Sequence, residues 1–126
     1  MNRTQIPYAA LKQVFHEPSR MALITALCAQ DGGILFADLK AQCRLTDGNL
    51  NRHLKALVDA GAARMEKHRD GARSRTVVFA TAAGREHFYA YLGSLEQVLR
   101  HTADALGYRE QVAYATPLWP VTTVGG

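Results

Sequence analysis

The sequence has few of the features that mark secreted, membrane-spanning or metal-binding proteins. It contains only two cysteines, Cys28 and Cys43, which do not form a CxxC pair and are too few for a disulfide framework. No apolar run approaches the roughly 20 residues that a membrane-spanning helix needs, and the first residues lack the apolar core of a signal peptide. We therefore expect a protein of the reducing cytoplasm, with both cysteines as buried or half-buried core residues.

Catalytic motifs are missing as well. No Ser/His/Asp set, pair of carboxylates, metal-ligand spacing or glycine-rich phosphate loop stands out. The pair Gly32 and Gly33 is not part of a GxGxxG pattern and is typical of a helix end. We expect no enzymatic activity, no cofactor and no metal site.

What the chain does have is enough apolar material for one domain and a modest excess of positive charge. Of its 126 residues, 48% are hydrophobic, which suits a single small core. Fifteen Lys and Arg residues against eleven Asp and Glu give a net charge of +4. Such an excess permits nucleic-acid binding without proving it, so the placement of the charge has to decide.

The pattern of apolar and turn-forming residues predicts a mainly α-helical (α+β) chain with one small β-hairpin. Helices are expected at 7–15, 18–30, 37–42, 47–60 and 81–106, and strands at 34–36, 62–68 and 75–80. This order is that of a winged helix-turn-helix with a long C-terminal helix. We place the DNA-binding domain at 1–107, including a dimerisation helix at 81–107, and a C-terminal tail at 108–126.

The helix expected at 47–60 combines a buried face with a face suited to DNA. At about 100° per residue, one face carries apolar side chains and the opposite face and its flanks carry small, amide and basic ones. The apolar face consists of Leu50, Leu54, Leu57 and Val58. Amides and guanidiniums can bond to base edges, and basic groups can reach phosphates. The candidate DNA contacts, with the expected N-cap first, are Thr46, Asn49, Asn51, Arg52 and Lys55.

Taken alone, this helix also fits an ordinary amphipathic surface helix. The short helix before it, across a tight turn at 43–45, favours the helix-turn-helix interpretation. Gly48 costs roughly 0.5–1 kcal/mol of helix stability relative to alanine. Close approach to a duplex, or to the preceding helix, would account for it.

Most of the excess positive charge lies in the expected hairpin. Residues 64–75 contain five Arg or Lys and two acidic residues, around the tight-turn signal Asp70-Gly71. An arginine-rich hairpin tip suits a minor groove, and the alternative is a hairpin whose charges only keep its edges soluble. The candidate DNA contacts here are Arg69, Arg73 and Arg75.

The last helix carries an apolar stripe that one small domain cannot cover. Its length is about 38 Å at 1.5 Å per residue, and an exposed stripe of that length would promote aggregation. Pairing with the same helix of a second chain would bury it around a two-fold axis and demand a roughly palindromic operator. The candidate dimerisation residues are Phe88, Leu92, Leu95, Leu99 and Leu106.

The five histidines are not arranged as ligands of one metal ion. His16, His53 and His68 are interpreted as surface or phosphate-contacting residues. His87 and His101 are 14 positions apart on one expected helix and cannot chelate a single ion within a chain. A site that bridges two chains remains as the alternative.

Residues 16–92 resemble the winged-helix transcriptional regulators related to the MarR and ArsR families. The matching segments are "HEPSRMALITAL" (16–27), "LTDGNLNRHLKALVDAGAARMEK" (45–67) and "RTVVFATAAGREHF" (75–88). The resemblance implies a dimeric DNA-binding transcription factor, often a repressor, and by resemblance alone a small aromatic effector in an apolar dimer pocket. Metal-sensing ArsR members carry a further cysteine two positions before the one matching Cys43, and this chain does not.

The sequence therefore predicts a regulator that binds double-stranded DNA sequence-specifically as a homodimer, most simply a repressor. The rival hypothesis is a winged-helix protein–protein interaction module without specific DNA binding, since fold alone does not fix function. A scaffold would not need a basic wing and an amide and basic helix face together, and this combination favours DNA.

Overall fold

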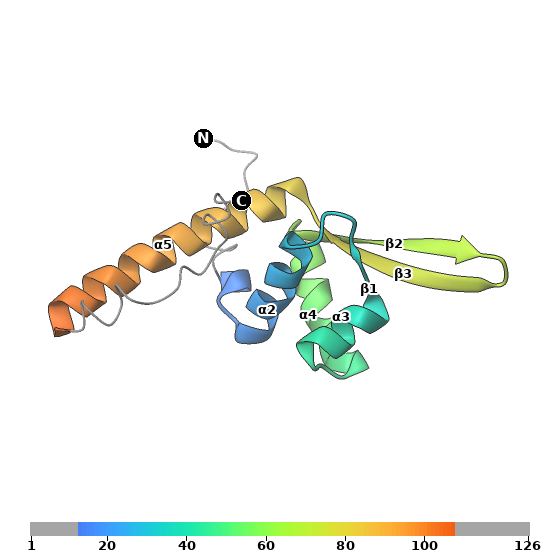
Figure 1. Ribbon diagram of the computed structural model, residues 1–126, viewed down its shortest axis with the longest axis horizontal. Helices are drawn as coiled ribbons and strands as arrows, with labels where there is room; N and C mark the ends of the chain where they lie inside the picture. Colours follow the sequence, from blue (N-terminus) through green and yellow to red (C-terminus); the bar gives the residue numbers. More distant parts are fainter. Residues whose placement is uncertain (1–12, 108–126) are drawn as a thin grey trace. The chain divides into compact units, whose positions relative to one another are not determined.

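The computed structural model describes residues 13–107 (Figure 1). The elements are α2 (Pro18–Cys28), β1 (Ile34–Leu35), α3 (Phe36–Cys43), α4 (Asp47–Asp59), β2 (Ala63–Asp70), β3 (Arg73–Ala80) and α5 (Ala82–Leu106). This order confirms the predicted mainly helical winged helix with one hairpin and a long last helix. Of the helix expected at 7–15, residues 13–15 are described and are helical. The tail at 108–126 lies outside the described residues.

The three strands form one antiparallel sheet in the order β1-β3-β2. The short β1 pairs Ile34 with Val78, and β2 pairs with β3 along its whole length, as far as Asp70 opposite Arg73. The hairpin is therefore longer than predicted, since β3 begins at Arg73 instead of Arg75. Gly71 has a φ of 69°, the left-handed conformation that a tight two-residue turn requires.

The core lies where α2, α3 and α4 pack together, and α2 and α3 also contact β3. Leu50, Leu54 and Leu57 of α4 are buried, which confirms most of the predicted apolar face. Val58 was placed on the same face but is 38% exposed. It lies about 80° around the helix from Leu50, at the edge of the buried stripe. The large buried side chains contributed by α2, α3 and β3 are Leu23, Ile24, Leu27, Leu39 and Val78.

The first turn of α5 is fixed to the backbone that follows α4. The Thr81 hydroxyl donates to the Gly61 carbonyl at 2.7 Å and accepts from the Gly84 N–H at 2.8 Å. The Thr81 N–H donates to the Ala62 carbonyl at 3.0 Å. A Cβ on Gly84 would lie 2.6 Å from the Ala62 Cα. Gly84 thus does more than weaken a helix start, because only glycine lets these two backbones approach so closely.

The described chain divides into two units, with the boundary between His87 and Phe88 inside α5. The first unit holds the helix-turn-helix and the hairpin. The predicted boundary at 107/108 adjoins undescribed residues and stays a prediction. No helix within 13–107 combines the length and apolar character needed to cross a membrane. Cys28 and Cys43 are both free and half-buried, as predicted.

Candidate nucleic-acid interface

The helix-turn-helix consists of α3, the turn at residues 44–46, and α4. Arg44 ends α3 in the left-handed conformation with a φ of 55°, which turns the chain toward α4. The Thr46 hydroxyl then accepts a hydrogen bond from the Asn49 N–H at 3.1 Å, confirming Thr46 as the N-cap. Lys40 Nζ lies 2.9 Å from Asp47 Oδ1, an ion pair that joins α3 to the first turn of α4. These contacts fix the angle at which α4 leaves the turn.

The side of α4 away from the core presents the predicted polar residues to solvent. Asn49, Asn51, Arg52 and Lys55 are all exposed. Arg52 Nη2 donates to Asn49 Oδ1 at 3.2 Å, so these two side chains act as a pair. Lys55 Nζ bonds to Asp59 Oδ2 at 2.8 Å, and this bond raises the pKa of the Lys55 ammonium. Lys55 is therefore cationic but partly neutralised by Asp59.

Gly48 lies in the first turn of α4, where nothing crowds it. A Cβ built on Gly48 would meet no atom within 4 Å. Packing against the preceding helix therefore does not explain the glycine. Of the two reasons for Gly48 given in the sequence analysis, close approach to a duplex stays a prediction.

His53 contradicts the interpretation of this residue as a surface or phosphate-contacting side chain. It is 3% exposed and lies on the inner side of α4. Arg20 Nη1 lies 3.5 Å from its Nδ1, and Arg52 Nη2 lies 3.5 Å from its Nε2. Glu17 Oε1 lies 3.7 Å from Nδ1. On a helical wheel His53 falls beside Leu50 and Leu57, a position that does predict burial, but its polar partners are distant in sequence.

The hairpin formed by β2 and β3, here called the wing, carries its basic residues on both faces. Cross-strand partners share a face, and successive residues alternate between faces. Arg75 lies opposite His68, and Arg73 opposite Asp70, so these two arginines share one face. Arg69 lies opposite Ser74 on the other face, together with Lys67. The three predicted wing arginines are all exposed, but they do not form one patch.

The base of the wing is neutralised by its own acid. Arg64 and His68 both pair with Glu66, and the Arg64 guanidinium lies 4.1 Å from the centre of the Phe79 ring. Within residues 13–107 the other basic residues of the wing form no ion pair. These are Lys67, Arg69, Arg73 and Arg75. The free positive charge of the wing is thus concentrated at its outer half.

The predicted dimerisation stripe on α5 is divided by exposure. Phe88 and Leu92 are already buried within a single chain, at 2% and 3% exposure. Leu95 is half-buried, whereas Leu99 and Leu106 are 43% and 64% exposed. The outer part of the stripe is therefore the part that stays exposed in a single chain.

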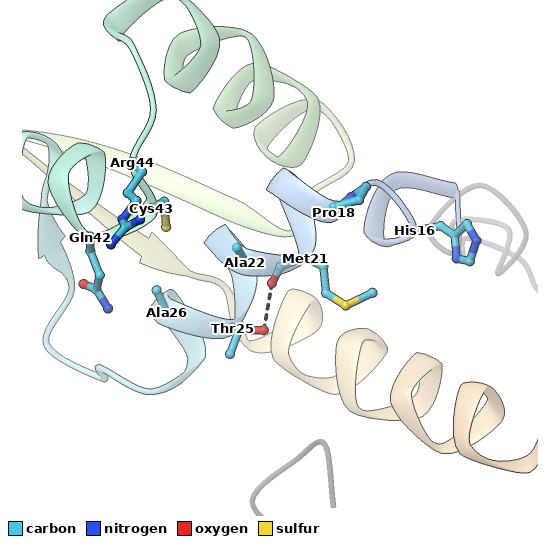
Figure 2. A pocket seen from close by; sticks show the side chains of 9 residues that line it. All are labelled: His16, Pro18, Met21, Ala22, Thr25, Ala26, Gln42, Cys43 and Arg44. Carbon is cyan, nitrogen blue, oxygen red and sulfur yellow. Dashed lines mark hydrogen bonds between the residues drawn. The ribbon is translucent and has the colours of Figure 1, made fainter. Parts of the chain in front are cut away.

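An open groove lies between α2 and the C-terminal end of α3, within the first unit (Figure 2). Its volume is about 650 Å³. The lining side chains are His16, Pro18, Met21, Ala22, Thr25, Ala26, Gln42, Cys43 and Arg44. The Thr25 hydroxyl donates a hydrogen bond to the Met21 carbonyl oxygen at 2.7 Å. The lining is mostly apolar, and Arg44, the first residue of the helix-turn-helix turn, adds a cation.

Residues 13–107 contain no group of three His, Cys, Asp or Glu side chains placed to hold a metal ion. Burial raises the thiol pKa of both Cys28 and Cys43, which favours their protonated form.

Comparison with known proteins agrees with the winged-helix fold described above. A family model described as "Winged helix DNA-binding domain" matches residues 19–99. The chain belongs to this family. An uncharacterized protein of Methanocaldococcus jannaschii is 35% identical over 66 residues, which cover 52% of this chain and 72% of that protein. The family is one of DNA-binding domains, in agreement with the prediction of a regulator and not an enzyme.

Solved structures share the fold. The transcriptional regulator homologue of Pyrococcus horikoshii OT3 matches with a TM-score of 0.66 and 28% identity, covering 71% of this chain and 88% of that one. The MepR–DNA complex of S. aureus matches with a TM-score of 0.57 and 16% identity, over 82% and 86% of the two chains. A MarR-family regulator of Silicibacter pomeroyi matches with a TM-score of 0.53 and 21% identity, over 94% and 77%. The last two likenesses concern the fold alone.

Proposed function

We propose that this winged-helix protein is a sequence-specific transcriptional regulator that acts on double-stranded DNA inside the cell. The observation that carries the proposal is the exposed, N-capped face of α4, where Asn49 and Arg52 form a pair, in a chain that also carries a basic wing. A helix that enters a major groove reads base edges with such amide and guanidinium groups.

The candidate contacts have different roles in this proposal. Asn49, Asn51 and Arg52 bond to base edges and set the sequence preference. The remaining residues contact phosphates and contribute affinity that falls with salt. They are Thr46, Lys55, Arg69, Arg73 and Arg75. The hydroxyl of Thr46 already caps α4, and its place at the helix N-terminus suits a phosphate oxygen.

We further propose that the protein acts as a homodimer on a palindromic operator, as a repressor. The support is the exposed apolar surface of α5 at Leu99 and Leu106, where burial would remove a solvent-exposed stripe. Leu95 continues this surface, and Phe88 and Leu92 support it from within the chain. Two recognition helices related by a two-fold axis reach successive major grooves about 34–36 Å apart.

Selection of bound DNA from a random pool with the purified protein tests the proposal. The expected product is a family of sequences with two related half-sites about one helical turn apart. A mobility shift on the DNA upstream of its own gene, with and without that motif, then measures specificity. Enrichment of no motif, together with equal binding to all duplexes, would favour the interaction module over a regulator.

We also propose a small-molecule effector. NadR, which has a similar fold with a TM-score of 0.57 and 21% identity to this chain, was crystallised in complex with 4-hydroxyphenylacetate. In this chain the groove beside Arg44 is a place where a ligand would touch the helix-turn-helix turn. Thermal shift with a panel of small aromatic acids tests this part. A shift that Met21→Glu abolishes would support the groove, and no shift with any acid would argue against it.

A further inference from the structure

His53 is the buried polar side chain in the described part of the chain, and it directly follows Arg52 of the DNA-reading face. Burying an imidazole costs free energy unless its nitrogens are paired. Its partners come from two elements: Glu17 and Arg20 at the N-terminus of α2, and Arg52 on α4. His53 therefore lies between the fixed frame of the domain and a candidate base contact.

The surroundings of the two ring nitrogens determine which one carries the proton. A guanidinium only donates hydrogen bonds, and a carboxylate only accepts them. Among the described residues, Nε2 faces the Arg52 guanidinium, at 3.5 Å, and a hydrogen bond between them requires Nε2 to accept. Nδ1 faces the Arg20 guanidinium at 3.5 Å and the Glu17 carboxylate at 3.7 Å, and the carboxylate makes it the ring nitrogen better placed to carry the hydrogen. The network thus assigns the neutral Nδ1–H tautomer.

The α2 side of this network is anchored independently of His53. Glu17 Oε1 accepts from the Arg20 N–H at 2.8 Å, as the N-cap of α2. Arg20 Nε donates to the Val14 carbonyl at 2.9 Å. On the other side, Arg52 Nη2 lies between Asn49 Oδ1 at 3.2 Å and His53 Nε2 at 3.5 Å. The other guanidinium N–H groups of Arg52 are left for a base edge.

We propose that His53 is a positioning residue for DNA recognition: its neutral imidazole holds the Arg52 guanidinium in the orientation that reads a base and ties it to the N-terminus of α2. The proposal rests on the proposed function, because Arg52 reads DNA only when α4 enters the groove. Losing the His53 acceptor leaves Arg52 Nη2 held by Asn49 Oδ1 alone and lowers the discrimination of Arg52, while its charge and its attraction to phosphates remain.

Protonation has the same consequence as loss of the acceptor. A charged imidazole carries hydrogen on both nitrogens, so Nε2 would oppose the Arg52 guanidinium instead of accepting from it. The charged groups around the ring are Glu17 and Arg20 from α2 and Arg52 from α4. Burial lowers the pKa of His53, the two arginines lower it further, and Glu17 opposes them. The neutral imidazole, which can accept from Arg52 through Nε2, therefore persists at neutral pH and is lost in acid.

The tautomer is tested on the free protein by ¹⁵N NMR of the imidazole nitrogens. The expected spectrum at neutral pH has a protonated Nδ1 and an unprotonated Nε2. The opposite tautomer, or a charged ring, would overturn the proposal whether or not the protein binds DNA. If the tautomer is as expected but the protein binds no duplex, the proposed function fails while the assignment stands.

The positioning role is tested by DNA selection with His53→Leu and His53→Gln, each in the presence and absence of Arg52→Ala. We expect His53→Leu to lower the preference for the base read by Arg52 by roughly 3- to 30-fold, a usual range for coupled neighbours. Its effect disappears in the Arg52→Ala background, and His53→Gln restores part of the preference through its amide oxygen. Arg73→Ala is the matched control, because it weakens binding to all sequences alike.

Two results would show that His53 has a merely structural role. One is an equal loss of affinity for every DNA sequence, and the other is an unchanged effect of His53→Leu in the Arg52→Ala background. Circular dichroism checks that each variant folds. If His53→Leu does not fold, the pH dependence of DNA selection by the wild-type protein tests the proposal instead. Its preference at the Arg52 position should fall as pH passes down through the pKa of His53 measured in the same NMR titration, and a flat profile across that pKa overturns the proposal.

Discussion

Gly84 in the first turn of α5 lies against the backbone of Ala62, so closely that a Cβ on Gly84 would stand 2.6 Å from the Ala62 Cα. The obstructing atoms are backbone and cannot rotate away. We therefore expect Gly84→Ala to destabilise the fold by at least about 1–3 kcal/mol, the usual cost of overpacking. Thermal unfolding followed by circular dichroism measures the change.

The same helix provides the control for this prediction. Gly93 of α5 has no atom within 4 Å of its would-be Cβ. Gly93→Ala should therefore stabilise the protein by about 0.5–1 kcal/mol, because alanine is the better helix former. Equal effects of the two substitutions would contradict the close approach at Ala62.

Gly48 offers a way to separate stability from DNA binding. Its position is open and helical, so Gly48→Ala should raise the free energy of unfolding by about 0.5–1 kcal/mol. If the first turn of α4 approaches a duplex closely, the added methyl group should also weaken DNA binding several-fold. Chemical unfolding and fluorescence anisotropy with a selected duplex measure the two effects. A more stable variant with unchanged affinity would show that this turn stays away from DNA.

The salt dependence of DNA binding should report on the wing. Each phosphate contact that is removed lowers the slope of log affinity against log salt by about 1. We expect a reduction of about 2 for Arg73→Ala with Arg75→Ala, which share one face. Arg69→Ala on the other face should lower it by about 1. Arg100→Ala on α5 removes an exposed charge paired with Glu96 and should leave the slope unchanged. Unchanged affinity and slope in the Arg73/Arg75 double variant would rule out the wing as a DNA contact.

Dimerisation through α5 should depend on its exposed apolar residues. Leu99→Glu places a charge in the proposed interface, and we expect a monomer of about half the wild-type mass that binds DNA weakly. Gln97→Glu adds the same charge on the opposite side of α5 and should leave the dimer intact. Light scattering at micromolar concentration distinguishes these outcomes. A wild-type protein with the single-chain mass of 13.8 kDa would refute the arrangement.

The stability of the fold should fall in acid because of His53. Burial and the neighbouring arginines lower its pKa below the ordinary 6.5, so below that pH the unfolded chain binds a proton that the folded chain does not. The stability is complete above 6.5 and is lost as pH falls toward the pKa of the folded state. Urea unfolding at a series of pH values should show this loss in wild type and a weaker one in His53→Gln. The same dependence in both proteins would assign it to other groups.

Glu17 adds a second loss at lower pH. Burial alone would raise its pKa, but the backbone N–H of Arg20 and the charges of His53 and Arg20 outweigh burial and lower it below 4.5. Its contribution is therefore present above 4.5 and disappears as pH falls through the lowered pKa. We expect Glu17→Gln to flatten the stability profile in that lower range and, because Glu17 holds up the pKa of His53, to lower the His53 pKa further.

Local patterns in the sequence were sufficient to predict the order of the elements, because helix periodicity and turn residues act over short distances. The buried leucines of α4, the Thr46 cap and the Gly71 turn were all predicted this way. What they could not supply was contact between distant segments. His53 meets Glu17 and Arg20 more than 30 positions away, and Gly84 meets Ala62 across the whole wing.

In the candidate site, too, local patterns predicted some features, whereas others depended on contacts between distant segments. Helical periodicity was enough to place Asn49, Asn51 and Arg52 on the exposed side of α4. The separation of Arg69 from Arg73 and Arg75 required the strand register, which extends closer to the tip than the sequence indicated. The division of the α5 stripe into buried and exposed parts required the packing of the folded chain.

The uneven charge along the wing also bears on how quickly a complex would form. Its base is neutralised by Glu66, while four basic residues and the single acid Asp70 occupy the outer half. A diffusing duplex would feel the tip first, and long-range attraction raises the rate of encounter much more than it slows escape. Charge reversal at the tip would then act mainly on the association rate, whereas changes on α4 would act on the lifetime of the complex. Stopped-flow kinetics would separate the two surfaces that an equilibrium measurement combines.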